Sequence, residues 1–365
     1  MLHASVCIGR QLSHATSSRH LFQTLTTISK MLAILVKDGK GPIDNLYLGE
    51  APTPDPKYGQ VIVKIKAFGL NRMDILQRKG NYPVPPGASD ILGVEFSGTV
   101  STLGEGVTKF KMNDEVFGIA GGGAYAEYIT VQETHLFLKP SHLSWTDAAS
   151  IPEVFLTAYQ ALVVYGEMKE GENVLVHAAA SGVGIAAIQL ARVRGAKTVI
   201  STASTKEKLD WLVNIPNGAT NGVNYKTQNF AEEVKKITNN KGVDVVIDFV
   251  GQNHWNKNIE SMAMDGRMTM LALLSGAKVS EFELTPLLYK RLRIQGSTLR
   301  SRTMAYQADL IRRFTDDFLE LITGEDGQGP IKTYIHKVYS WKNIQDAHRD
   351  MEGNQTIGKL VAVVD

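Results

Sequence analysis

The stretch from residue 174 to residue 189 constrains the fold of this chain more than any other part of its sequence. It starts with an apolar run, Val174–Val176, and continues through small residues at 178–184. From Ile185 onward, apolar residues recur at helical spacing. A strand, a tight glycine-containing turn and a helix in this order are typical of a dinucleotide-binding loop, because the helix N-terminus offers free N–H groups to a pyrophosphate.

The glycine pattern of this loop is incomplete, since Ala and Ser occupy the early positions of the G-x-G-x-x-G fingerprint and Ala187 occupies the last. Alone, the loop would also fit a tight strand-to-helix connection in any α/β protein. Further apolar runs follow at helix-length intervals, at 198–200, 243–249 and 268–273. Strands that alternate with helices form parallel sheets, so we predict an α/β fold with a doubly wound sheet. The predicted cofactor loop comprises Ser181, Gly182, Val183 and Gly184.

The segment after the second predicted strand indicates which cofactor the loop would hold. Proteins that prefer NADH place an acid about 20 residues beyond the glycines, where it binds the ribose. Here residues 201–208 contain hydroxyl side chains and two lysines, and Glu207 lies beyond the strand end. Hydroxyl and ammonium groups suit a 2′-phosphate, so the sequence favours NADPH. The alternative is an ordinary helix cap with solvated lysines.

Length and composition exclude several classes of protein. A chain of 365 residues suggests two or three domains, and 43% hydrophobic residues can form a sizeable core. The net charge of +2 gives no argument for nucleic acid as the main partner. No apolar run is long enough to span a membrane. The only cysteine is Cys7, which excludes disulfides and cysteine zinc sites from the folded body.

Residues 1–30 differ in composition from the rest of the chain. They contain basic residues and many Ser and Thr but no acid, and the first acid is Asp38. This composition predicts a mitochondrial transit peptide, and hence a matrix protein. Residues 19–24 resemble a matrix-processing pattern with cleavage after Ile28. The alternative is a disordered tail. Met31 could serve as a second start and give a cytoplasmic form.

The remaining chain divides by its periodicity. Residues 31–153 contain short β patterns with Gly and Pro turns, including strand candidates at 61–67 and 124–128, and indicate a small β-barrel-like domain. After the α/β stretch, the pattern becomes helical beyond Arg300, and a last strand is predicted at 360–364.

Several stretches, taken together, are similar to the zinc-independent quinone oxidoreductase (zeta-crystallin) family of medium-chain dehydrogenases/reductases. They are LNRMD (70–74), PPGASDILG (85–93), ASIPE (149–153), LTAY (156–159), SGVGIAAIQL (181–190), NYK (224–226), LRSR (299–302) and IGK (357–359). Within that family the chain is most similar to the tumour-suppressor-inducible branch. The resemblance implies a GroES-like catalytic domain at 31–153 completed by 299–365, a Rossmann domain at 154–298, and a homodimer.

Two positions depart from the zinc-dependent relatives. Asn71 stands where those relatives carry a Cys, and Val94 stands where they carry a His before Glu95. The four-Cys structural lobe is also missing. Without thiolate or imidazole there is no tetrahedral site to polarise an alcohol, so we expect no metal and disfavour an alcohol dehydrogenase.

The resemblance also implies site residues. Asn71 would bind a substrate oxygen and Tyr82 would stack on a ring or donate its hydroxyl, with Asp74 grouped beside them as catalytic. A turn-forming Asn and a surface-loop Tyr are the alternatives. Thr157 would contact the nicotinamide, unless it is a helix cap. The other implied cofactor-binding residues are Ser204, Lys208 and Tyr225 around the 2′-phosphate, Lys359, and Val250, Gly251, Ala272, Leu273 and Leu274 at strand ends.

The function that the resemblance implies is transfer of hydride from NADPH to a quinone. A reductase of α,β-unsaturated carbonyls or enoyl thioesters is the alternative within enzymes, because the same hydride delivery serves both. Outside enzymes, some relatives bind AU-rich RNA, and the basic cluster at 290–293 is the one local feature in favour of that role.

Overall fold

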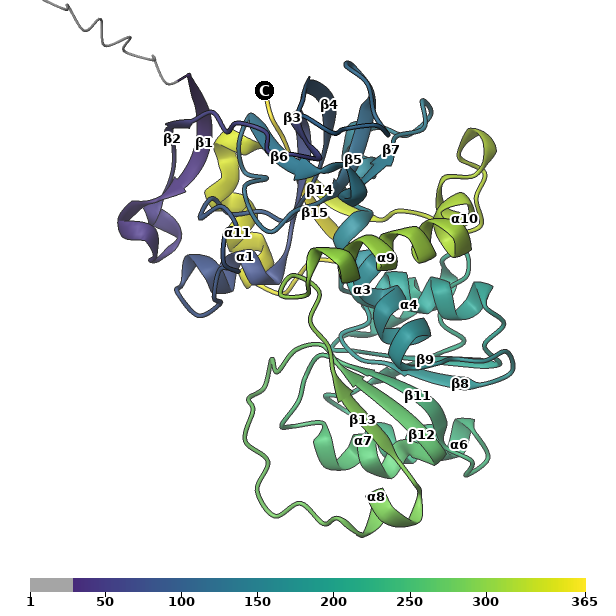
Figure 1. The fold of residues 1–365 in the computed structure, drawn as a ribbon. Coiled ribbons are helices and arrows are strands. Elements are labelled where there is room, and N and C mark those ends of the chain that lie inside the picture. The colour runs from purple at the N-terminus through teal and green to yellow at the C-terminus, as the bar shows by residue number, and fades with distance from the viewer. Residues whose placement is uncertain (1–28) are drawn as a thin grey trace, which may run out of the picture.

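The computed structural model describes residues 29–365, which form two lobes (Figure 1). The predicted transit peptide and its cleavage site after Ile28 lie outside these residues, so both stay predictions. Among the helices of residues 29–365, none is long and apolar enough to cross a membrane.

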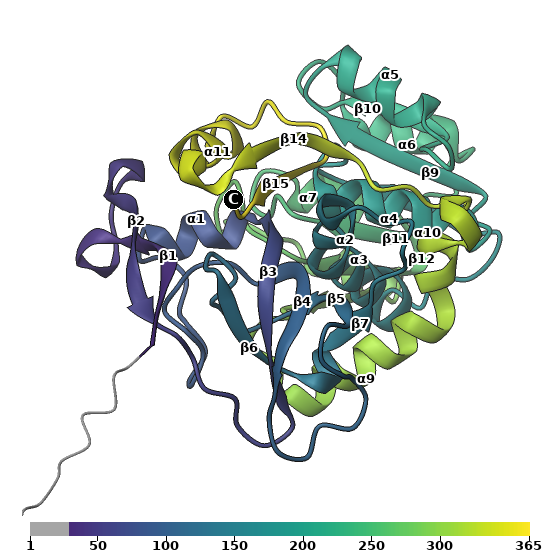
Figure 2. The ribbon, with the colours of Figure 1, turned by 90° about the horizontal axis from the view of Figure 1, so that it is seen from above.

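The first lobe is built on a seven-stranded, mainly antiparallel sheet that the C-terminal segment completes (Figure 2). The strand order is β14-β15-β3-β4-β5-β7, and β6 pairs with β3. The bounds are β3 (Gln60–Leu70), β4 (Glu95–Leu103), β5 (Glu115–Ile119), β6 (Tyr128–Gln132), β7 (Leu136–Leu138), β14 (Ile335–Ser340) and β15 (Lys359–Val363), with a separate hairpin of β1 (Lys30–Val36) and β2 (Leu46–Pro52). Leu360 of β15 lies opposite Leu70 of β3, which brings both ends of this lobe together.

Aromatic packing fixes the interior of this lobe near the end of β3. Tyr125 is fully buried and stacks on Phe68, with ring centroids 4.4 Å apart. Gly93, at φ 90°, makes room for this ring, because a Cβ there would lie 2.4 Å from Tyr125. The helices of the lobe are α1 (Arg72–Arg78), α2 (Trp145–Ala149) and α11 (Ile344–Glu352).

The second lobe is a six-stranded parallel sheet of order β10-β9-β8-β11-β12-β13, which confirms the predicted α/β fold with a doubly wound sheet. Its strands are β8 (Asn173–Val176), β9 (Thr198–Ala203), β10 (Asn221–Asn224), β11 (Val243–Asp248), β12 (Met262–Met270) and β13 (Arg293–Gly296). Val174 and Val176 pack on one face, with α3 and α4, while Leu175 packs on the other, with α6 and α7.

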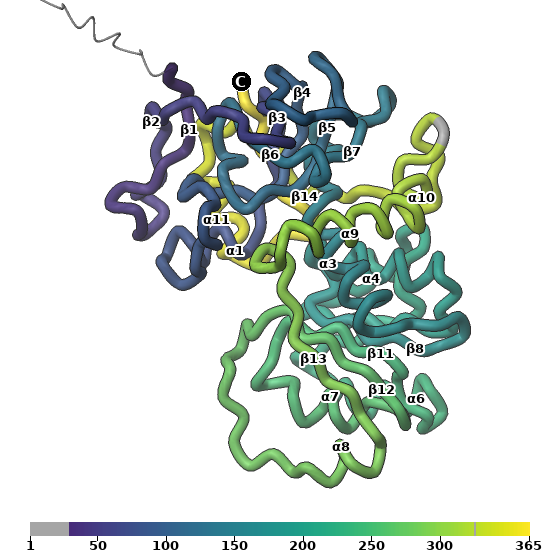
Figure 3. Tube along the Cα trace, viewed as in Figure 1, coloured from purple at the N-terminus to yellow at the C-terminus, as the bar shows by residue number. Residues whose placement is uncertain are grey.

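Helices cover both faces of this sheet and connect it to the first lobe. They are α3 (Pro152–Tyr159), α4 (Gly182–Val193), α5 (Lys206–Asn214), α6 (Phe230–Ile237), α7 (Trp255–Ser261), α8 (Thr285–Tyr289), α9 (Met304–Phe314) and α10 (Glu320–Thr323). The tube of Figure 3 shows the long excursion that carries α8 between β12 and β13, away from the sheet.

Two strand predictions need correction, and two further strands were missed. Only Tyr128 of the predicted strand 124–128 lies in β6, because Tyr125 instead bonds the backbone of Leu92. The predicted strand 268–273 starts earlier and ends at Met270. The edge strands β10 and β13 were not predicted, since edge strands carry polar residues and lack an apolar run.

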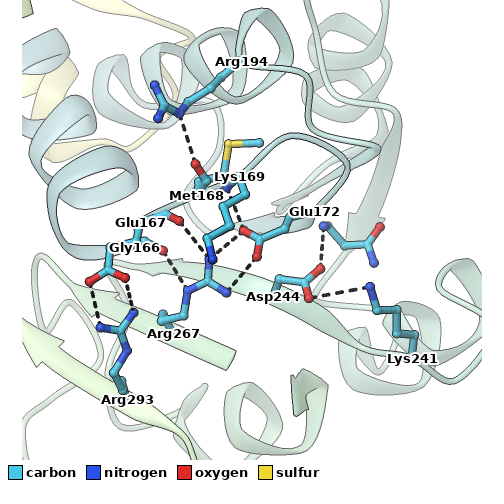
Figure 4. A network of polar contacts seen from close by, with 11 residues as sticks. Gly166, Glu167, Met168, Lys169, Glu172, Arg194, Lys241, Asp244, Arg267 and Arg293 are labelled. Carbon is cyan, nitrogen blue, oxygen red and sulfur yellow. Dashed lines mark hydrogen bonds and ion pairs between the residues drawn. The ribbon is translucent and has the colours of Figure 1, made fainter. Parts of the chain in front are cut away.

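A polar network lies at the amino-terminal edge of the parallel sheet (Figure 4). Arg267 forms a bidentate ion pair with Glu172, at 3.0 and 2.6 Å, and donates to the carbonyl oxygens of Gly166 and Glu167. Arg267 is 9% exposed, so this network replaces water around a nearly buried guanidinium.

Candidate active site

A buried polar cluster lies where β3 ends and the two lobes meet. Lys359, from the start of β15, donates from Nζ to the Leu70 carbonyl oxygen at 2.8 Å and to Asn71 Oδ1 at 2.9 Å. It also forms an ion pair with Oε1 of Glu95, which is fully buried. The Lys359 ammonium therefore binds the polar atoms that surround the position where zinc-dependent relatives hold their metal.

These contacts fix the orientation of the Asn71 amide. Asn71 Oδ1 accepts from Lys359, and Nδ2 donates to Glu95 Oε1 at 2.8 Å. An amide nitrogen carries two N–H groups, so one remains for a ligand oxygen. Asn71 thus has the chemistry that the sequence predicted for it, but its orientation depends on Lys359 and Glu95. Glu95 was not predicted as a site residue.

Asp74 lies fully buried behind Asn71 and acts on its backbone. Its Oδ2 accepts the Asn71 N–H at 2.8 Å and the Tyr125 hydroxyl at 3.1 Å, and Oδ1 is enclosed without a partner among the described residues. Burial raises the pKa of Asp74 to about 6. The structure therefore gives Asp74 a positioning role instead of the predicted catalytic one.

Tyr82 and Arg300 form a second part of the cluster. The Arg300 guanidinium lies 5.6 Å from the ring centroid of half-buried Tyr82. It donates to the Gly121 carbonyl oxygen and to Gln77, while Nη2 is enclosed without a partner among residues 29–365. Burial and nearby Glu153 raise the pKa of Tyr82, so its hydroxyl remains a donor at neutral pH. Arg300 was quoted in the LRSR stretch but was not predicted as a site residue.

The loop between β8 and α4 has the geometry of an anion cradle. Ser181 caps α4 and accepts the Gly184 N–H at 3.1 Å, whereas the N–H groups of Gly182 and Val183 lie in the first turn, where a helix supplies no acceptor. Gly182 also has to lack a side chain, because a Cβ there would lie 2.9 Å from Lys359 Cδ. These donors and the positive end of the α4 dipole fit a pyrophosphate.

The residues predicted around a 2′-phosphate come from three neighbouring elements. Ser204 follows β9, Lys208 lies in the first turn of α5, and Tyr225 follows β10. Lys208 Nζ donates to the Asn354 carbonyl oxygen at 2.9 Å. Burial lowers the pKa of Lys208, the negative charge of Glu207 opposes this shift, and the positive charge of Lys226 adds to it, so a second cation acts at this position. Lys226 was not predicted, although it follows Tyr225 directly.

Lys359 does not join the cofactor residues as predicted. Only its aliphatic stem passes the cofactor loop, beside Gly182, and all the recorded contacts of its ammonium lie in the cluster around Asn71. The pairing of strand β15 with β3 pulls the side chain away from the loop and into that cluster.

Other predicted cofactor contacts also have different surroundings in the structure. The N–H groups of Val250 and Gly251 both donate to Asp248, each at 3.0 Å, so they are not free to bind a ribose. Thr157 is the sixth residue of α3, which excludes both the predicted helix start and the alternative of a helix cap. The remaining predicted contacts follow the end of β12 at Met270 and lie in a partly exposed loop, at Ala272, Leu273 and Leu274.

One group of side chains outside this cluster has donor atoms close enough together for a metal ion. His177, Asp248 and His254 offer atoms within 4.8 Å of one another. His177 uses both ring nitrogens, on Thr202 at 2.8 Å and Asn258 at 2.7 Å, and Asp248 is engaged by backbone N–H groups. The group therefore lacks three free lone pairs and does not fit a metal as it stands.

Comparisons with known proteins agree with this geometry. Residues 57–141 match the family model described as the alcohol dehydrogenase GroES-like domain, and residues 182–316 match the model described as zinc-binding dehydrogenase. A quinone oxidoreductase from Sus scrofa is 30% identical over 336 residues, which cover 92% of this chain and 98% of that protein. The synaptic vesicle membrane protein VAT-1 homolog from Rattus norvegicus is 32% identical over 347 residues, covering 91% and 84%.

Solved structures give the same result. The Escherichia coli quinone oxidoreductase complexed with NADPH has a TM-score of 0.80 and 29% identity, covering 92% of this chain and 100% of that one. A quinone oxidoreductase from Pseudomonas syringae has a TM-score of 0.81 and 30% identity at the same coverage. The predicted tumour-suppressor-inducible branch stays a prediction, since VAT-1 homologues are also similar. The chain belongs to the zinc-independent quinone oxidoreductase family of medium-chain dehydrogenases/reductases, and is an oxidoreductase with a nicotinamide cofactor.

Proposed function

We propose that this protein is an NADPH-dependent quinone oxidoreductase that works without a metal. The observation that carries the proposal is the Lys359 ammonium, which binds Asn71 Oδ1, Glu95 Oε1 and the Leu70 carbonyl oxygen. These atoms and apolar Val94 do not fit a metal ion while the ammonium is present.

The chain's own residues would bind and orient the substrate. The free Asn71 N–H donates to a substrate oxygen, and Tyr82 offers a ring face and a hydroxyl beside it. The cofactor, when bound, supplies the hydride. Because these groups act on any conjugated carbonyl, a reductase of α,β-unsaturated carbonyls or enoyl thioesters is the second candidate.

The RNA-binding alternative loses its local support. Lys290 Nζ donates to three carbonyl oxygens, of Ile259, Glu260 and Met262, at 2.9 to 3.0 Å. In the same cluster, Arg291 pairs with Asp265 and Arg293 with Glu167. These cations are therefore engaged within the protein, and the cluster is no free basic surface.

Homodimer formation and a mitochondrial location remain proposals. The feature that supports a dimer is the unpaired edge of β13, flanked by the exposed side chains of Leu284, Leu288 and Tyr289. The location rests on the composition of residues 1–30 alone.

A substrate screen tests the proposed function. The purified protein should oxidise NADPH with ortho- and para-quinones at higher kcat/KM than with enones, and a chelator should leave the rate unchanged. Elemental analysis should find substoichiometric zinc. Chelator-sensitive turnover with stoichiometric zinc would overturn the metal-free proposal, and exclusive activity with enones would favour the second candidate.

The preference for NADPH should depend on Lys208. Lys208→Ala removes a charge-assisted hydrogen bond to the 2′-phosphate, a loss of about 1.5–3 kcal/mol, and should weaken NADPH binding about tenfold to a hundredfold at low salt. NADH lacks this phosphate, so its Kd should change less than about threefold. Titration calorimetry with both cofactors measures the two effects.

Lys206→Ala is the matched control for this variant. Lys206 lies two positions earlier, is exposed and pairs with Asp210, so its replacement should affect both cofactors little. If Lys208→Ala weakens the binding of NADPH and of NADH equally, Lys208 has a structural role through the Asn354 carbonyl oxygen and does not bind the 2′-phosphate.

A further inference from the structure

Glu153 is a buried carboxyl group without a hydrogen-bond partner, at the centre of the cluster. It is the second residue of α3, and its backbone N–H donates to Glu95 Oε2 at 2.9 Å, which fixes its position. The residue is 5% exposed, and its carboxyl oxygens bond no residue in the described part of the chain. Neither carboxyl oxygen is among the fully enclosed unpartnered atoms of residues 29–365, so the carboxyl is not sealed off from a ligand or solvent.

The distribution of hydrogen-bond donors decides which carboxyl of the cluster carries a proton. Glu95 accepts from the Lys359 ammonium, from Asn71 Nδ2 and from the Glu153 backbone. Glu153 lies near the same carboxylate and receives none of these donors. The Lys359 ammonium is fully engaged and binds only one of the two adjacent carboxyl groups, Glu95. Glu153 has no cation of its own and therefore holds the proton.

The titratable groups that act on Glu153 come from several elements of both lobes. They are Glu95 on β4, Lys359 on β15, Asp74 on α1, Arg300 after β13 and Tyr82 after α1. Burial, followed by the negative charge of Glu95, raises the pKa of Glu153 to about 8, and Lys359 and Arg300 oppose this shift. The carboxyl is consequently an acid at neutral pH.

We propose that Glu153 is the proton donor to the reduced substrate, an inference that rests on the proposed function. A bound nicotinamide cofactor would supply the hydride, that is two electrons and one hydrogen, and the quinone or enone that accepts it would become an anion. The O–H bond of Glu153 then breaks, a bond to that proton forms on the substrate anion, and the product is neutral. Water returns a proton to the Glu153 carboxylate, which completes the cycle.

Glu153→Gln tests this role, because glutamine keeps the size and the backbone contact but holds no acidic proton. Loss of a general acid should lower kcat about 100-fold or more, with little change in the Kd of the cofactor. Wild-type kcat should fall as the pH rises through about 8, and the variant should show no such fall. Glu153→Asp, which keeps an acid on a shorter side chain, should restore part of the rate.

Infrared difference spectroscopy of the cofactor-free protein gives a readout independent of activity. At pH 7, where Asp74 with its pKa of about 6 is mostly ionised, the wild type should show a protonated carboxyl band that is lost in Glu153→Gln and persists in Glu260→Gln, the control at a half-exposed site. If that band is unaffected by Glu153→Gln, or if the variant keeps kcat within threefold and the same pH profile, the proposal is overturned. A wild type that reduces neither quinones nor enones would instead overturn the proposed function, while the spectrum still decides which carboxyl holds the proton.

Discussion

Lys359→Met should lower the free energy of unfolding by about 3–5 kcal/mol, because it leaves the Glu95 carboxylate as a buried charge without its cation. Met has nearly the same length as Lys, so the change removes charge and leaves the volume filled. The Asn71 amide also loses the donor to its Oδ1 and is no longer held in one orientation. Misplacement of this group should lower kcat about 100-fold. Denaturant unfolding and steady-state kinetics measure the two effects.

Two variants separate charge burial from general sensitivity to lysine loss. Lys235→Met removes a cation from Glu260 at a half-exposed site, and should change stability by less than about 1 kcal/mol. Lys359→Met combined with Glu95→Gln removes the uncompensated charge, and should recover part of the stability but not kcat. A Lys359→Met protein that is less than 1 kcal/mol below the wild type would show that water already screens this ion pair.

Arg267→Met should destabilise the second lobe by about 3–5 kcal/mol without altering the cofactor site. The change leaves the Glu172 carboxylate without its bidentate partner, and the carbonyl oxygens of Gly166 and Glu167 without a donor. The network lies at the amino-terminal edge of the parallel sheet (Figure 4), whereas the predicted cofactor loop follows the carboxyl end of β8. NADPH affinity of the folded variant should therefore match that of the wild type.

Arg293→Met is the control for this prediction. Arg293 pairs with Glu167 at a half-exposed site, so its loss should change stability by less than about 1 kcal/mol. Similar losses of unfolding free energy in Arg267→Met and Arg293→Met would indicate that burial does not strengthen the Arg267 network. Weaker NADPH binding by the folded Arg267→Met protein would contradict the separation of the two edges.

Local pattern was enough to predict the parallel sheet and its cofactor loop. Central strands such as β8 and β11 are buried on both faces and therefore appear as mainly apolar runs. The edge strands β10 and β13 were missed because they carry polar residues. The residues Asn71 and Val94 were visible in the sequence as replacements for zinc ligands, since side-chain identity alone excludes a thiolate or an imidazole.

The partners of these residues depended on the tertiary structure. Lys359 and Asn71 are 288 positions apart, and only the pairing of β15 with β3 places the ammonium on the amide oxygen. Because this strand pairing cannot be read from the sequence, Lys359 was predicted to bind the cofactor, and no role was predicted for Glu153. The sequence by itself determined which chemical groups are available for the site. Contacts between distant strands and helices decided the hydrogen-bond partners and the protonation of these groups, because burial and neighbouring charges depend on the tertiary structure.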